Sequence, residues 1–74
     1  MGITLIQFLN LFDDEDVRVS LIDAETNEEL LHAWYSDIYD SLVGFSDAFE
    51  FLRNKDYNVK GFDFINDILV IDVI

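Results

Sequence analysis

The chain has 74 residues and no cysteine, 51% of its residues are hydrophobic, and its formal net charge is −12. A chain of this length buries only a modest core, and without cysteine neither a disulfide nor a thiolate metal site can reinforce it. The apolar content, which includes seven Phe residues, argues against disorder despite the high charge. We therefore predict one folded domain spanning residues 1–74.

The charge limits which partners are plausible, because sixteen acidic residues face only four basic ones. Direct binding of nucleic acid is nearly excluded, since neutralising phosphates requires Lys and Arg, and an anionic membrane surface is disfavoured for the same reason. No apolar run approaches the roughly 18 residues of a membrane span, and the N-terminus lacks the basic leader of a signal peptide. We expect a cytoplasmic protein whose natural partner is a basic protein surface.

The first half of the chain predicts a helix followed by a hairpin. Thr4 can cap a short helix whose apolar residues, from Leu5 to Phe12, cover most of its circumference. Residues 17–23 alternate between two faces, with Val17, Val19 and Leu21 on one side, which is typical of a strand. A polar turn over residues 24–29 and a return strand over residues 30–36 complete the hairpin.

From Asp37 onward the apolar period becomes helical. The apolar stripe consists of Ile38, Leu42, Phe45, Phe49 and Leu52. Gly44 interrupts this stripe, and the sequence DAFE at residues 47–50 is an acidic variant of a capping box. The pattern therefore fits either one helix with a weak point or two short helices.

The last third of the chain predicts a second pair of strands. Residues 57–64 form a strand in which Gly61 indicates a bulge, because the apolar phase shifts on passing it. Asn66 and Asp67 form a turn into residues 68–74, which are apolar on both faces, as in a central or doubly covered strand. The order α-β-β-α-β-β predicts an α+β domain with a mainly antiparallel sheet and helices packed on it.

Residue types that carry chemistry are scarce. The single histidine, His32, is flanked by Leu31 and Ala33, a setting that favours a structural or surface role over that of a catalytic base. A calcium loop starting at Asp23 would need Gly at its sixth position and Glu at its twelfth, where the chain has Glu28 and Trp34. We expect no enzymatic activity, no cofactor and no specific metal site.

The acidic residues recur in three groups. They are Asp13, Asp14, Glu15 and Asp16 after the first helix; Asp23, Glu25, Glu28 and Glu29 around the hairpin turn; and Asp37, Asp40, Asp47 and Glu50 on the outer side of the second helix. One such group is usually a solvated face, and the first is placed where a helix C-terminus favours cations. Strands hold alternate carboxylates roughly 6.6 Å apart, so rigid elements can present them at near-regular intervals, as a polyanion does.

The opening MGITLIQFLNLFDDEDVRVSLID joins a cap, an apolar helix, an acidic turn and a strand. The chain resembles the small acidic accessory proteins encoded by phages and prophages of Gram-positive bacteria. The resemblance lies in this arrangement, in the size of the chain and in its charge. Some of these proteins mimic DNA and inhibit host-defence nucleases or DNA-repair enzymes. The resemblance implies an anti-defence inhibitor of this kind, but it includes no motif from which contact residues can be transferred.

We predict from these observations a non-enzymatic DNA mimic that occupies the basic groove of a nucleic-acid-binding protein. An apolar anchor such as Val43, Phe51 or Trp34 would supply desolvated affinity. The alternative is a protein–protein interaction module, or a homodimeric phage accessory protein, without mimicry. Val43 and Phe51 favour that alternative, because they project toward the acidic side of the second helix.

Overall fold

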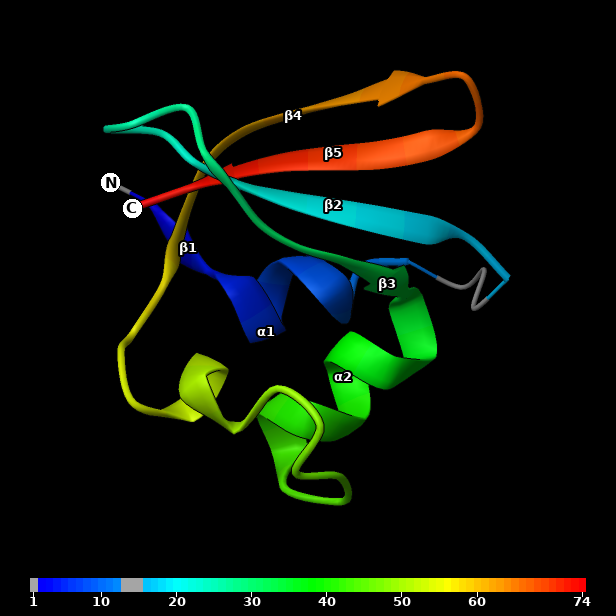
Figure 1. Cartoon of the computed structure of the whole chain (residues 1–74), viewed down its shortest axis with the longest axis vertical. Coiled ribbons are helices and arrows are strands. Elements are labelled where there is room, and N and C mark those ends of the chain that lie inside the picture. Colours follow the sequence, from blue (N-terminus) through cyan, green and yellow to red (C-terminus); the bar gives the residue numbers. More distant parts are fainter. Residues whose placement is uncertain (1, 13–15) are drawn as a thin grey trace.

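The computed structural model describes residues 2–12 and 16–74. Its elements, shown in Figure 1, are β1 (Ile3–Thr4), α1 (Leu5–Leu9), β2 (Arg18–Asp23), β3 (Glu29–Trp34), α2 (Tyr35–Val43), the 3-10 helix η1 (Glu50–Arg53), β4 (Asn58–Ile65) and β5 (Ile68–Val73). The predicted α+β class is confirmed, with the short strand β1 as an addition. Three residues of the first acidic group, Asp13, Asp14 and Glu15, lie outside the described residues.

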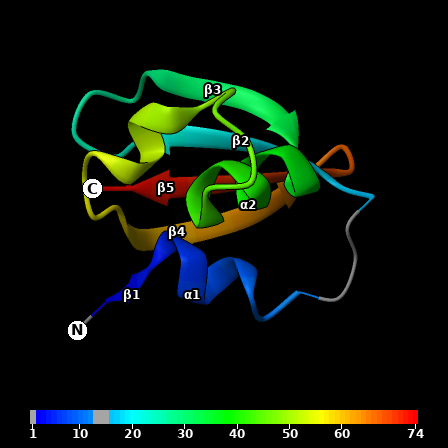
Figure 2. The same ribbon diagram turned by 90° about the horizontal axis from the view of Figure 1, so that it is seen from below.

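The strands form one sheet in the order β1-β4-β5-β2-β3. Neighbouring strands are antiparallel, except that β2 and β5 run parallel and pair from Arg18 opposite Ile68 to Asp23 opposite Val73. The parallel pair joins the β2–β3 hairpin to the β4–β5 hairpin, and α2 and η1 connect these hairpins along the chain. Figures 1 and 2 show that the helices all lie on one face of the sheet.

The core lies between this face and the helices. The predicted inward residues of β2, Val19 and Leu21, are fully buried, and β5 contributes Leu69, Ile71 and Val73 beside them. From the helical layer the core receives Leu5, Leu9, Ile38 and Leu52. β5 is a central strand, as predicted, and helices cover only one of its faces; its other face carries Ile68, Val70 and Asp72.

Helix α1 begins with the predicted cap, and its last residue, Leu9, is hydrogen-bonded to a buried tyrosine of α2. The Thr4 side chain accepts a hydrogen bond from the Gln7 amide at 3.3 Å, and the Gln7 side chain accepts one from the Thr4 amide at 3.0 Å, so that a capping box is formed. At the other end the hydroxyl of Tyr35, the first residue of α2, donates to the Leu9 carbonyl. The same carbonyl also accepts a hydrogen bond from the Phe12 amide at 3.2 Å, and the Tyr35 bond ties the two helices together.

Residues 37–54 form two helical segments, because α2 ends at Gly44. Gly44 has φ +92°, and the amides of Gly44, Phe45 and Ser46 all donate to the Asp40 carbonyl at 3.0, 2.8 and 3.2 Å. The chain turns away from the helix axis here, so the predicted apolar stripe is wrong at Phe45, whose side chain is 84% exposed. The alternative of two short helices is the one confirmed.

The predicted capping box at residues 47–50 is wrong. The Asp47 carboxylate instead accepts a hydrogen bond from Arg53 at 2.8 Å. The Ser46 hydroxyl accepts one from the Ala48 amide at 3.2 Å, and η1 begins after Phe49 without a side-chain cap. Arg53 competes for Asp47 because a charge-assisted bond is stronger than a neutral one.

The predicted hairpin features of the last third are confirmed. The pairing with β5 shifts between Val59 and Gly61, which is the expected bulge and keeps Val59 and Phe62 on the same face. Asn66 and Asp67 have φ 51° and 64°, the left-handed pair of a two-residue hairpin turn. The return strand of the first hairpin is shorter than predicted, because α2 begins at Tyr35 rather than at Asp37.

The backbone at Gly44 leads to a stability prediction with a matched control. Gly44→Ala should lower the free energy of unfolding by about 1–2 kcal/mol, because an L-residue resists the left-handed conformation. Gly61→Ala places its Cβ 4.0 Å from the nearest heavy atom at an ordinary φ and should leave stability unchanged or raise it. Urea unfolding of both variants checks this, and equal losses would contradict the account of Gly44.

Candidate partner-binding surface

The face of the sheet opposite the helices is named the open face. Side chains on a strand alternate between its two faces, so the residues between the core positions of β2 to β5 point to this side. Strand pairing arranges them in three rows: Ile65, Ile68, Arg18 and Trp34; Asp63, Val70, Ser20 and His32; and Gly61, Asp72, Ile22 and Glu29. None of the described helices lies over this face (Figures 1 and 2).

The middle of the open face is mixed: its two central strands carry the apolar residues Ile22, Ile68 and Val70 beside Arg18, Ser20 and Asp72. Ile22, Ile68 and Val70, on the central strands β2 and β5, are partly buried by their neighbours alone. Trp34 lies at the β3 edge of the first row and is 46% exposed, and Ile65 lies at the β4 edge of that row and is also exposed. Antiparallel sheets commonly place polar residues on the side that faces water, so the apolar residues on the central strands depart from the usual pattern.

A small polar network fixes one corner of the open face. The buried Ser20 hydroxyl donates to the Glu29 carboxylate at 2.9 Å, and His32 Nδ1 lies 4.0 Å from the same carboxylate oxygen. His32 is exposed on the surface, as predicted for a surface histidine. The network holds the Glu29 carboxylate at a defined position on the face.

The end of the sheet at which β2 and β5 begin is named the acidic end, and it contains Asp16, Asp37 and Asp67. Asp16 and Asp67 line a shallow hollow with Trp34 and Arg18, and Asp37 lines a second hollow that contains the same two residues. The Arg18 guanidinium lies over the Trp34 ring, 5.0 Å from its centroid. Sheet topology thus brings together three carboxylates that are far apart in the sequence, around the single tryptophan.

The predicted helix-dipole argument fails for Asp16, and the dipole acts in the favourable direction on Asp37, for which no dipole effect was predicted. α1 ends at Leu9, so Asp16 lies beyond the last turn, where the dipole has no effect. Asp37 lies in the first turn of α2, where the dipole favours a carboxylate. The local electrostatics of the acidic end are therefore less unfavourable than the sequence indicated.

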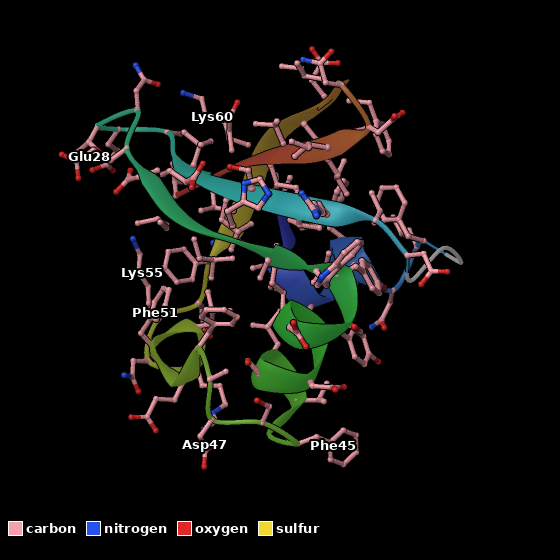
Figure 3. The ribbon with its side chains drawn as sticks, turned by 45° about the vertical axis from the view of Figure 1, so that its right-hand side comes forward. Glu28, Phe45, Asp47, Phe51, Lys55 and Lys60 are labelled. Carbon is pink, nitrogen blue, oxygen red and sulfur yellow. The ribbon has the colours of Figure 1, made fainter. Side chains whose placement is uncertain are left out.

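The second predicted group lies at the opposite end of β2, at the hairpin turn. The Asp23 carboxylate accepts a hydrogen bond from the Glu25 amide at 2.9 Å, and Asn27 takes a left-handed conformation with φ 61°. Glu25 and Glu28 are exposed, and Figure 3 shows Glu28 at the tip of this hairpin. The turn is thus hydrogen-bonded and carries its carboxylates outward.

The third predicted group does not form one stripe. Asp37 and Asp40 belong to α2, but Asp47 lies in the following turn and Glu50 belongs to η1. Figure 3 shows Asp47 at the far end of the molecule from Glu28. Because α2 stops at Val43, the helical spacing that was expected to align these residues is absent.

Exposed apolar side chains lie on the helix-covered side as well. Val43 is 40% and Phe51 is 38% exposed, so Phe51 is not folded under a neighbouring strand. Phe62 and Phe64, which the sequence analysis did not select, point to the same side from β4 and are more than half exposed. The Phe62 ring is 4.9 Å from that of Phe8 in α1, so β4 exposes aromatic surface beside α1.

Three acidic residues of this surface were missed by the sequence analysis. Asp63 and Asp72 lie on the open face between core positions of β4 and β5, and Asp67 lies in the turn between these strands. The alternation of Asp72 with Ile71 and Val73 was a usable signal in the sequence. The meeting of Asp67 with Asp16 depends on the parallel pairing of β2 and β5, for which the sequence has no local signal.

Among the described residues no group of three or more His, Cys, Asp or Glu side chains is arranged to hold a metal ion. None of the helices in residues 2–12 and 16–74 is long and apolar enough to cross a membrane. In comparisons with family models, curated proteins and solved structures, no family, relative or structural neighbour matches the chain.

The acidic end can be tested through the fluorescence of Trp34. At low salt, caesium should quench this fluorescence at least about twofold more efficiently than iodide, because three carboxylates outweigh Arg18 around the indole. The difference should disappear at about 1 M salt, where the Debye length is about 3 Å.

A matched pair of variants separates the local field from the net charge. Asp37→Asn/Asp67→Asn should reduce the difference between the quenching efficiencies of caesium and iodide. Glu50→Gln/Asp56→Asn removes the same charge from the helix-covered side and should leave most of the difference in place. Equal effects of the two double variants would show that the acidic end has no local field of its own.

Proposed function

We propose that this protein is a cytoplasmic, non-enzymatic inhibitor that mimics DNA and occupies the basic groove of a nucleic-acid-binding protein, such as a host-defence nuclease or a DNA-repair enzyme. The observation that carries the proposal is the set of exposed carboxylates on the open face and at both ends of the sheet. Among the described residues, Glu25, Glu28, Asp63 and Asp67 are exposed and form no ion pair.

The basic residues leave these carboxylates available. Arg53 donates to Asp47 and to the carbonyls of Ser41 and Ser46, on the helix-covered side. Lys55 lies over the ring of Tyr57, 4.9 Å from its centroid. Two of the four cations are thus used within the fold and away from the open face. Arg18 lies on the open face but over the Trp34 ring, so acidic residues outnumber the single arginine among the open-face positions.

The spacing of the open-face carboxylates supports mimicry of a phosphate backbone. Asp63 and Asp72 are diagonal neighbours on adjacent strands, which places them roughly 7–8 Å apart. Asp72 and Glu29 share a row two strands apart, at about 9.6 Å. Because the sheet backbone is rigid, a basic groove meets these charges without ordering them first, which lowers the entropic cost of binding.

Competition with DNA tests the proposal. The immobilised chain should retain a protein from a lysate of the cell that carries the gene. A double-stranded oligonucleotide should release this protein, because both ligands require the same groove. About 1 M salt should release it as well, since screening removes the charge attraction. Retention that survives both treatments would contradict mimicry.

Charge-neutralising variants locate the contact. Glu25→Gln/Glu28→Gln and Asp16→Asn/Asp67→Asn each remove two carboxylates from one end of the sheet, and each should weaken retention about tenfold by slowing association. Glu50→Gln/Asp56→Asn, on the helix-covered side, should change retention by less than about twofold. If the three double variants behave alike, net charge rather than a specific surface determines binding.

The exposure of Val43 and Phe51 supports a second candidate, an interaction module or homodimer without mimicry. That function predicts weak salt dependence and a loss of binding in Val43→Ala/Phe51→Ala, because desolvated apolar contacts would carry the affinity. Mass measured in solution across a dilution series tests the homodimer directly. A monomer at every concentration would remove the homodimer.

A further inference from the structure

The open face combines apolar side chains on its central strands with acidic side chains beside them. Ile22, Ile68 and Val70 occupy its two central strands, while Trp34 and Ile65 close the first row at its two edges. Carboxylates of Asp63, Asp72 and Glu29 lie in the second and third rows, and the acidic end and the hairpin end bound the face on the remaining sides. A face that only kept the protein in solution would not need apolar residues on its central strands.

The charges decide which occupant this face can accept. A second copy of the chain would bring two molecules of net charge −12 into contact, and like charges at close range oppose association. A basic partner gains from the same charges and can cover the apolar residues of the central strands with its own apolar side chains. Charge complementarity therefore selects a basic protein surface over self-association.

We propose that the open face docks a basic, extended protein segment in which apolar and Lys or Arg side chains alternate. A segment of this kind carries its apolar side chains on one face and its cations on the other. The long stems of Lys and Arg let their charged ends bend around the segment toward carboxylates beside it. Its apolar side chains would cover Ile22, Ile68 and Val70, and its cations would reach Asp63 and Glu29 on the outer strands and Asp72 on β5. The inference rests on the proposed function for the basic nature of the partner, and it adds the surface and the side-chain pattern that this surface recognises.

Trp34 is the anchor of this surface. It is the largest side chain of the open face, it is half exposed, and the Arg18 guanidinium stacked on one side of its ring limits its motion. Large aromatic side chains held in place before binding supply much of the affinity of protein interfaces. The hollows on both sides of Trp34, lined by Asp37 and by Asp67, can receive cationic side chains of the partner next to this anchor.

Two defined peptides test the inference on the full chain. The first is a short synthetic peptide of alternating Lys and Leu, and the second has Ser in place of every Leu and therefore the same charge. Backbone amide shifts measured by NMR during titration report which residues each peptide contacts. The Lys–Leu peptide should bind about tenfold or more tightly than the Lys–Ser peptide and should shift the amides of Ser20, Ile22 and Val70.

Variants of the chain distinguish specific peptide binding at the open face from nonspecific attraction between a cationic peptide and an acidic protein. Trp34→Ala and Val70→Lys should each remove most of the preference for the Lys–Leu peptide, and Asp63→Asn/Asp72→Asn should weaken its binding about tenfold. Phe45→Ser removes an equally conspicuous aromatic from the helix-covered side, and Glu50→Gln/Asp56→Asn removes equal charge there. Both controls should leave the preference in place.

Several outcomes would overturn the inference. Equal binding of the two peptides, or shifts confined to the helix-covered side around Val43, Phe45 and Phe51, would place the contact elsewhere. Open-face shifts that depend on protein concentration without any peptide would make a second copy the occupant. The proposed function fails separately, through the lack of DNA competition in the lysate experiment, so the two failures are distinguishable.

Discussion

The parallel pairing of β2 and β5 is the constraint on which the rest of the structure depends. It aligns Val19 and Leu21 with Leu69 and Ile71 in the centre of the sheet, where all four are fully buried. Burial contributes about 0.8 kcal/mol per methylene group. These four side chains therefore supply much of the folding free energy of a chain that has no disulfide. Because the same strands alternate, each core residue fixes its neighbour on the opposite face. The positions of Ser20, Ile22, Val70 and Asp72 therefore follow from the packing of the core.

The open face follows from the placement of the helices as well as from the alternation of side chains along the strands. With α1, α2 and η1 all on one side, no described helix lies over the second face. A sheet covered on one side only is ordinary for a small α+β domain. What is unusual here is that the uncovered side carries Ile22, Ile68 and Val70 on its central strands together with acidic residues on and around them. This combination links the composition of the chain, which is both apolar and strongly acidic, to a surface suited to a basic partner.

Local sequence patterns predicted the helices and strands but not the contacts between them. The Thr4 cap, the alternation in β2, the bulge at Gly61 and the turn at Asn66 are each determined by residues within a few positions, and the structure confirms them. The capping box at Asp47 failed because Arg53, six residues away, binds that carboxylate. The acidic end could not be predicted, because Asp16, Asp37 and Asp67 are brought together only by the pairing of β5 with β2 and of β2 with β3. Short-range signals thus identified the strands and helices, and long-range pairing determined the candidate surface.

Site-specific photo-crosslinking tests the central claim most directly. A photoreactive residue is placed at position 70 on the open face or at position 45 on the helix-covered side, and each variant is irradiated with the protein that the immobilised chain retains. Our account predicts crosslinks from position 70 that double-stranded DNA suppresses, and few or none from position 45. Crosslinks that form only from position 45, or that form from position 70 in the presence of saturating DNA, would contradict it.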